Sequence, residues 1–132
     1  MKRFMVFMLV LLFLGCSTGH DFSMIEPAGQ KQIELIGKGL DPKLTIVKGC
    51  AVKSSSHKDS YYVSALVNGP QKADVGVWWI SGAREEPGLI LAVDGFAFVY
   101  SSYPRARKTW VGARATDDEV KLMKAYLSQG NE

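Results

Sequence analysis

A run of apolar residues at positions 75–80 limits the folds open to this chain more than any other feature of the sequence. Successive side chains of a strand point to opposite faces of a sheet, so Trp78 and Trp79 face opposite ways. A second run, at positions 89–93, is apolar in the same manner. Antiparallel sheets with one solvated face alternate apolar and polar residues instead. The two runs therefore predict strands that are covered on both faces.

Further strands are predicted from alternation and from β-branched and aromatic composition. They cover residues 44–52, 61–67 and 110–113, the last as a short edge strand. An irregularity is expected at Gly49 in the first of them. Asp94 and Gly95 form a strong hairpin signal between residues 89–93 and 96–100. A helix that begins at Gly95 is the alternative for the second arm.

The clearest predicted helix lies near the C-terminus. Thr116 and Glu119 fit a capping box, in which the Thr116 hydroxyl accepts from a free backbone N–H and Glu119 reaches back to the cap residue. The apolar stripe of this helix consists of Val120, Met123 and Leu127. Residues 33–40 carry apolar side chains at both helical and alternating spacing, so helix and strand both stay open there.

The order of these elements, strands first and a helix last, predicts an α+β fold. We expect an antiparallel meander of about four to six strands, packed by the C-terminal helix, as one domain over residues 33–132. The helix covers one face of the sheet. Residues 33–40, another part of the chain or a partner molecule covers the other.

The N-terminus has the layout of a secretory signal. Lys2 and Arg3 precede an uncharged apolar run over residues 4–14, and small residues follow. The run is shorter than the roughly 20 residues that a membrane-spanning helix needs. Residues 1–15 are therefore predicted to be cleaved, and residues 16–32, which are mostly polar, are predicted to form a flexible tether.

Residues 13–16, Phe-Leu-Gly-Cys, resemble the lipobox of bacterial lipoprotein precursors. The resemblance implies that Cys16 is lipidated, carries fatty acids such as palmitate and becomes the mature N-terminus, so that the protein is anchored to a membrane. Ser17 then implies the periplasmic face of the outer membrane in a two-membrane bacterium. In a one-membrane bacterium the location is the outer face of the cell membrane. An ordinary signal cut at residues 17–19, which leaves a soluble product, is the alternative.

Charge and cysteine content exclude several classes. Loss of Lys2 and Arg3 with the signal lowers the formal net charge from +3 to +1, so no affinity for nucleic acid is expected. Lipidation of Cys16 leaves Cys50 without a partner in the chain. Cys50 is then buried, paired between molecules or a free thiol, and its strand-like setting favours burial. No cofactor is indicated.

No catalytic or metal site is predicted. His57, Lys58 and Asp59 lie among serines and supply the residue types of a hydrolase triad. Neighbours in one polar loop point in different directions, however, whereas triads are assembled from separate elements. The mature domain holds His57 and Cys50, with His20 in the tether, which is too few ligands at suitable spacing for zinc.

Two features are candidate binding surfaces. Trp78 and Trp79 are the first, because exposed tryptophans stack on sugars or anchor protein interfaces, although both also fit a core. The second is the stretch at positions 103–110, which has no acidic residue; this stretch and the residues that follow it up to position 114 are here called the basic loop. Its candidate binding residues are Arg105, Arg107, Lys108 and Trp110, with Arg114 nearby. It suits anionic lipid headgroups, phosphorylated glycans or an acidic protein surface, against the alternative of a solvated loop.

These features predict a membrane-anchored envelope lipoprotein whose domain is a non-catalytic binding or interaction module. Its partner would be an envelope protein or a wall component. The alternative is a small envelope enzyme, or an inhibitor of one. A cleft that gathers His57, Asp59 and Tyr61 would favour the enzyme. An exposed apolar patch around Trp78 or Trp79 would favour the binding module.

Overall fold

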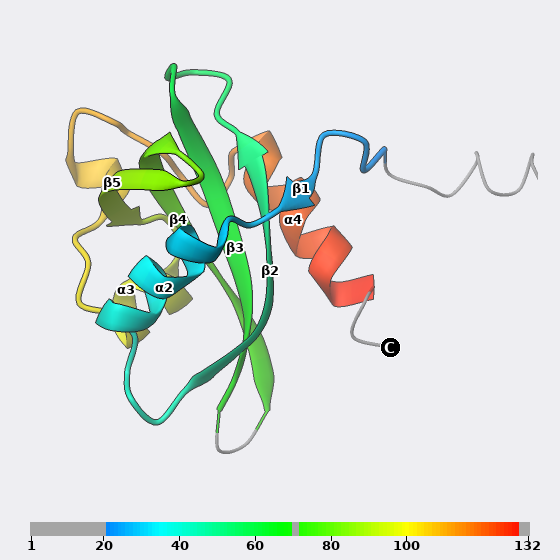
Figure 1. Ribbon diagram of the computed structural model, residues 1–132, viewed down its shortest axis with the longest axis vertical. Coiled ribbons are helices and arrows are strands. Elements are labelled where there is room, and N and C mark those ends of the chain that lie inside the picture. The colour runs from blue at the N-terminus through cyan, green and yellow to red at the C-terminus, as the bar shows by residue number, and fades with distance from the viewer. Residues whose placement is uncertain (1–20, 70–71, 130–132) are drawn as a thin grey trace, which may run out of the picture.

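The structure, a computed structural model, describes residues 21–69 and 72–129. Its centre is a five-stranded antiparallel sheet in which the strands lie in chain order (Figure 1). The strands are β1 (Glu26–Pro27), β2 (Thr45–Lys53), β3 (Ser60–Asn68), β4 (Ala73–Ala83) and β5 (Glu86–Ala92). The helices are α2 (Gln30–Gly39), α3 (Gly95–Tyr100), the short 3-10 helix η1 (Ala106–Lys108) and α4 (Asp118–Gln129). The predicted α+β class and the antiparallel meander are confirmed.

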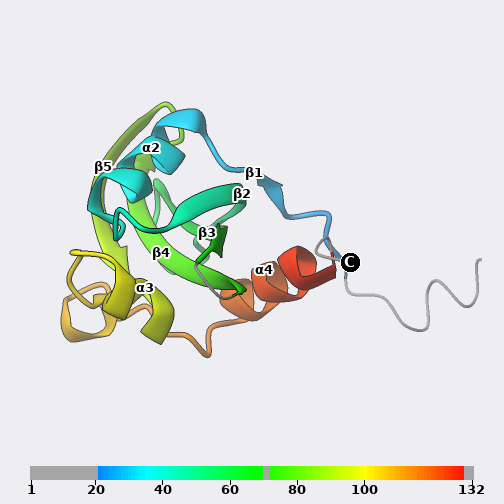
Figure 2. The ribbon, with the colours of Figure 1, turned by 90° about the horizontal axis from the view of Figure 1, so that it is seen from below.

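The apolar run of β4 is buried on both faces, as predicted, and the second run is buried from Ile90 to Val93, whereas Leu89 is 46% exposed. Trp78 and Trp79 are adjacent on β4, yet they belong to two different apolar clusters. Trp79 lies in one cluster with Met123 of α4, and Trp78 lies in the other with Ile36 of α2. Figure 2 shows α2 on one side of the curved sheet and α4 on the other, and Ala97 of α3 belongs to the cluster of Ile36. The sheet thus lies between two helical layers.

Residues 33–40, which the sequence left open, belong to helix α2. The helix begins at Gln30, where the buried Gln32 side chain accepts the Gly29 N–H at 2.9 Å. Just before it, β1 pairs with β2 through Glu26 and Pro27. The tether expected to extend to residue 32 is therefore already part of the fold from about residue 26. Residues 16–20 of that tether lie outside the described residues, as do Cys16 and the predicted signal.

Two of the predicted strands are wrong. Residues 95–100 form helix α3, the stated alternative, because the Asp94 carboxylate accepts the Ala97 N–H at 2.9 Å and caps the helix. Residues 110–113 form a turn rather than an edge strand, and Gly112 has a φ of 64°. At residues 94–95, the helix cap outweighs the local Asp-Gly hairpin signal. At residues 110–113, the left-handed Gly112 favours a turn over a strand.

Two local details also differ. The irregularity of β2 lies between Ile46 and Lys48 rather than at Gly49. The predicted capping box is not formed, because α4 begins at Asp118 and the residue before it is Asp117 rather than Thr116; the Glu119 carboxylate accepts from Ser55. The Ser55 N–H and hydroxyl lie 3.0 and 2.7 Å from Glu119 Oε2. This contact attaches the β2–β3 loop to the helix.

Candidate anion-binding site

Trp78 and Trp79, two of the predicted binding residues, are core residues. Their exposed fractions are 0% and 2%. The Trp78 indole N–H donates to Ser101 Oγ at 3.2 Å, and its ring lies against Gly76, where a Cβ atom would come within 2.7 Å of it. Neither side chain is available to a ligand, because both faces of β4 are covered. Trp78 and Trp79 therefore contribute no exposed surface of their own to a binding site.

The basic loop is a closed turn, and Arg107, Lys108 and Arg114 are exposed on it. The Ala106 carbonyl oxygen accepts from the Thr109 N–H at 3.0 Å, the Thr109 hydroxyl at 2.7 Å and the Gly112 N–H at 3.2 Å. Thr109 Oγ1 also accepts from the Val111 N–H at 3.2 Å. Several donors therefore converge on one carbonyl and fold the chain around it.

The loop is also fastened to the rest of the domain. The Ala92 N–H at the end of β5 donates to the Pro104 carbonyl at 2.7 Å. Ala106, Val111 and Ala113 are buried in the same cluster as Met123 of α4. A loop held by both hydrogen bonds and buried side chains presents its charged residues from fixed backbone positions.

Three arginines of this loop line one pocket, whose volume is about 360 Å³. They are Arg105, Arg107 and Arg114, and the remaining lining residues are Val93, Asp94, Gly95, Ala115 and Thr116. The start of α3, the basic loop and the approach to α4 meet here. The sequence grouped the arginines along the chain, but only the fold shows that they share a pocket with residues 93–95.

The three guanidinium groups have no carboxylate partner among the described residues. Over all the residues that the structure describes, the ion pairs are Arg84 with Glu26 and Lys124 with Asp94. Arg105 is placed over the Phe98 ring, with its guanidinium carbon 4.0 Å from the ring centre, which orients it without neutralising it. The pocket therefore carries uncompensated positive charge.

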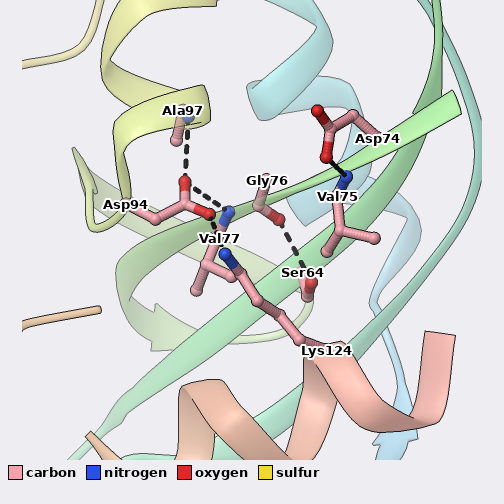
Figure 3. A network of polar contacts seen from close by, with 8 residues as sticks. All are labelled: Ser64, Asp74, Val75, Gly76, Val77, Asp94, Ala97 and Lys124. Atoms are coloured by element: carbon pink, nitrogen blue, oxygen red, sulfur yellow. Dashed lines mark hydrogen bonds and ion pairs between the residues drawn. The ribbon is translucent and has the colours of Figure 1, made fainter. Parts of the chain in front are cut away.

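Asp94, which also lines the pocket, is already engaged (Figure 3). Its Oδ1 accepts the Ala97 N–H at 2.9 Å and the Val77 N–H at 3.2 Å. Its Oδ2 pairs with Lys124 Nζ at 2.7 Å. The carboxylate is 3% exposed and its charge is matched by Lys124, so it leaves the arginines free to attract an anion.

Lys108 and Trp110 lie on the same loop but outside the pocket lining. Lys108 is exposed, and Trp110 has 75% of its surface exposed. The Trp110 ring is held edge-to-face by Trp79, at 6.1 Å between ring centres, and by His57, at 5.5 Å. The Trp110 ring is thus exposed on one side and packed against the rings of Trp79 and His57 on the other.

The His57 loop shows no assembled triad. Ser56 Oγ lies 3.1 Å from His57 Nδ1, but the two residues are neighbours in the chain. The Ser60 hydroxyl donates to the His57 carbonyl at 2.8 Å, and the Asp59 carbonyl accepts the Gly82 N–H at 2.6 Å. These contacts close the loop. Within the described ranges, no group of three or more His, Cys, Asp or Glu residues could hold a metal ion.

Cys50 is buried, as its setting predicted, with 1% of its surface exposed. Burial raises the pKa of its thiol to about 12, and the charge of Lys48 opposes this rise. A thiol with such a pKa stays protonated at neutral pH and is a poor nucleophile. Cys50 is therefore a core residue.

A second pocket, of about 460 Å³, lies between the start of β2, the β3–β4 end and α3. Its charged residues are Lys43 and Lys72 with Asp41 and Asp74, so the two signs balance. It is larger than the arginine pocket, but its charged residues favour neither an anion nor a cation. The arginine pocket is therefore the better candidate site.

Comparison of the chain with protein families, with curated proteins and with solved structures finds no match. None of the helices in the described ranges is both long and apolar enough to span a bilayer.

Proposed function

We propose that this protein is an exported envelope lipoprotein whose domain binds an anionic group in the arginine pocket, without catalysing a reaction. One observation carries the proposal: three guanidinium groups without carboxylate partners line a single pocket. Like charges gathered in one place repel one another, so such an arrangement costs stability unless an anion is bound there.

The chemistry of the pocket favours oxyanions. A guanidinium is planar and offers paired N–H donors that match the two oxygens of a carboxylate or a phosphate. The closed basic loop fixes the backbone positions of Arg105 and Arg107, which lowers the entropy lost on binding. The ligand class is therefore an anion with two or more oxygens.

The anchor is the second part of the proposal. The apolar run at residues 4–14 and the lipobox-like residues 13–16 support a lipid on Cys16, with the protein attached to the periplasmic face of the outer membrane or to the outer face of a single membrane. The partner would then be an anionic component of the envelope, either a wall polymer or a protein.

Anion binding is tested by calorimetric titration of the full lipidated chain, in a non-ionic detergent, with inorganic phosphate. We expect wild type to bind phosphate and the double variant Arg107→Ala/Arg114→Ala to lose at least tenfold in affinity. The control, Lys58→Ala/Lys121→Ala, removes the same charge from exposed positions outside the pocket and should bind as wild type does. Equal affinity of the two double variants would contradict the proposed site.

The anchor is tested separately by fractionating cells that express the full chain. Wild type is expected in the membrane fraction, and Cys16→Ala is expected to lose its lipid and leave that fraction. Cys50→Ala is the matched control, since it removes the other cysteine of the sequence. Retention of Cys16→Ala in the membrane with an unchanged mass would overturn the lipid anchor and leave the pocket untouched.

A further inference from the structure

Trp110 is the most exposed large apolar side chain among the described residues, at 75%. Edge-to-face contacts with Trp79 and His57 hold the Trp110 ring in place, so it is exposed in a fixed position. Solvent exposure of so large an apolar surface is unfavourable, and a supported, exposed indole is a common binding surface. The ring offers a ligand a rigid apolar platform.

This platform belongs to the same closed turn as the arginines of the pocket. Three peptide steps separate Arg107 from Trp110, so their Cα atoms lie within about 11 Å of each other. The bonds to the Ala106 carbonyl fix the turn between them. Arg107 and Trp110 both have long side chains, so one sugar ring with an attached phosphate is able to contact a guanidinium group and the indole together.

The position of the loop in the domain indicates where such a ligand lies. Figures 1 and 2 both place the basic loop and η1 on the opposite side of the domain from residues 21–27. A lipid on Cys16 would be five residues from Asp21, which limits that span to about 18 Å. A domain of this size has a radius of gyration of about 13 Å, so its two sides lie roughly 30 Å apart. When the axis from residues 21–27 to the basic loop lies along the membrane normal, the pocket faces away from the headgroups of the anchoring bilayer.

From these observations we infer that the ligand is an anionic saccharide, a sugar that carries a phosphate or a carboxylate group. The arginine pocket binds the charged group, and Trp110 stacks on the apolar face of a sugar ring. A concave pocket of about 360 Å³ suits a single small group better than a flat acidic protein surface. This inference rests on the proposed anion pocket, which binds the charged group. It adds the sugar ring, which Trp110 and not the pocket would recognise.

The test uses the full lipidated chain in non-ionic detergent, with glucose 1-phosphate and inorganic phosphate as paired probes. We expect glucose 1-phosphate to bind about tenfold more tightly, a difference of about 1.4 kcal/mol. Trp110→Ala should abolish that preference and leave the affinity for phosphate unchanged. Trp110→Phe keeps an aromatic platform and should retain most of the preference. Tyr126→Ala, which removes an exposed aromatic ring from α4, is the control and should bind as wild type does.

Fluorescence gives a second readout that does not depend on affinity. The chain has three tryptophans, of which Trp78 and Trp79 are buried, so acrylamide quenching reports on Trp110. Glucose 1-phosphate should protect this fluorescence from quenching, and phosphate should not. Absence of protection would overturn the stacking role.

The other outcomes separate the two proposals. Equal affinity for both probes, or a Trp110→Ala variant with an unchanged preference, overturns the saccharide inference while the anion pocket stands. Tighter binding of AMP, of glycerol phosphate or of a hexaglutamate peptide than of glucose 1-phosphate also overturns it, in favour of a nucleotide, a lipid headgroup or an acidic protein segment. Failure of both phosphate and glucose 1-phosphate to bind overturns the proposed function itself.

Discussion

Asp94 connects three elements through one buried carboxylate. It caps α3 through the Ala97 N–H, accepts the Val77 N–H of β4 and pairs with Lys124 of α4. Burial of a charged group is unfavourable unless hydrogen bonds and an opposite charge compensate it, and here all of these are present. Asp94 therefore stabilises the junction at which the pocket forms.

Replacement of Asp94 measures this contribution. Asp94→Ala leaves two backbone N–H groups and the Lys124 ammonium without their acceptor, and we expect the free energy of unfolding to fall by about 2–4 kcal/mol in urea denaturation. Asp94→Asn keeps an oxygen that accepts the N–H bonds and should cost less. A change below about 0.5 kcal/mol for Asp94→Ala would show that the junction does not depend on the carboxylate.

Two buried groups make the protein sensitive to alkali. Burial raises the pKa of the Cys50 thiol from 9.0 to about 12. Burial, followed by the hydrogen bond to the Asp117 carboxylate, also raises the pKa of the Tyr62 phenol. Both groups lose their protons more readily in the unfolded chain. The Cys50 contribution to stability is therefore complete below pH 9 and is lost as the pH rises to about 12, whereas the Tyr62 contribution is complete below pH 10 and declines above it.

Urea denaturation at pH 8, 9, 10 and 11 tests this expectation. The free energy of unfolding should decline above pH 9, by up to about 1.4 kcal/mol for each pH unit and each group. Cys50→Ala and Tyr62→Phe should each flatten part of the decline. A wild-type stability that stays constant from pH 8 to pH 11 would contradict the assignment of these raised pKa values.

At the scale of elements, the turn of the basic loop requires one glycine. Gly112 has a φ of 64°, in the left-handed region that residues with a Cβ atom rarely adopt, although no atom lies within 4 Å of its Cβ position. Gly37 also has open space around its Cβ position, but it lies in helix α2. The same substitution should therefore have opposite effects at the two sites.

Gly112→Ala is expected to lower the free energy of unfolding by about 1–2 kcal/mol, because the left-handed conformation is disfavoured. Gly37→Ala should raise it by about 0.5–1 kcal/mol, because alanine loses less backbone entropy in a helix. Thermal unfolding of both variants provides the measurement. Equal effects of the same sign would show that the loop adopts another conformation in solution.

The strands were largely predictable from the sequence because alternation and apolar runs survive in the folded sheet. Helix α3 was predicted only as an alternative, since Asp94 and Gly95 favour a hairpin locally. The contacts that decide between the two come from Val77 and Lys124, which are distant in the sequence. The predicted boundary between tether and domain, at residues 32 and 33, lies too late in the chain, because Gln32 is buried despite its polarity.

The candidate site was predictable only in part. The charges of the basic loop are visible in the sequence, but its rigidity depends on buried Ala106, Val111 and Ala113, whose small side chains give no local signal. Trp78, Trp79 and Trp110 are all candidate binding residues by sequence, but only Trp110 is exposed. Which tryptophans are buried depends on the covering helices.

At the scale of the whole molecule, the sheet separates two apolar clusters. Ile36 of α2 and Met123 of α4 are both fully buried, one in each cluster. Layers packed on opposite faces of a sheet lie about 10 Å from it, so these side chains do not touch. The two clusters should therefore contribute to stability independently.

We expect Ile36→Ala and Met123→Ala each to lower the free energy of unfolding by about 2–5 kcal/mol. The double variant should lose the sum of the two within about 0.5 kcal/mol, since distant sites add. Urea denaturation of the four proteins closes the cycle. A coupling energy above about 1 kcal/mol would mean that the stability contributions of the two clusters depend on each other.

The convergence of donors on the Ala106 carbonyl also bears on how long such a protein survives among proteases. Arg105, Arg107 and Lys108 offer three cleavage positions for a trypsin-like enzyme within four residues. Such enzymes require an extended substrate segment, and exposed loop tips are their usual targets. The closed turn is not extended, so its peptide bonds are protected from cleavage until the hydrogen bonds to the Ala106 carbonyl have broken. A cluster of cations is in this way displayed on the surface without becoming the place where the chain is cut.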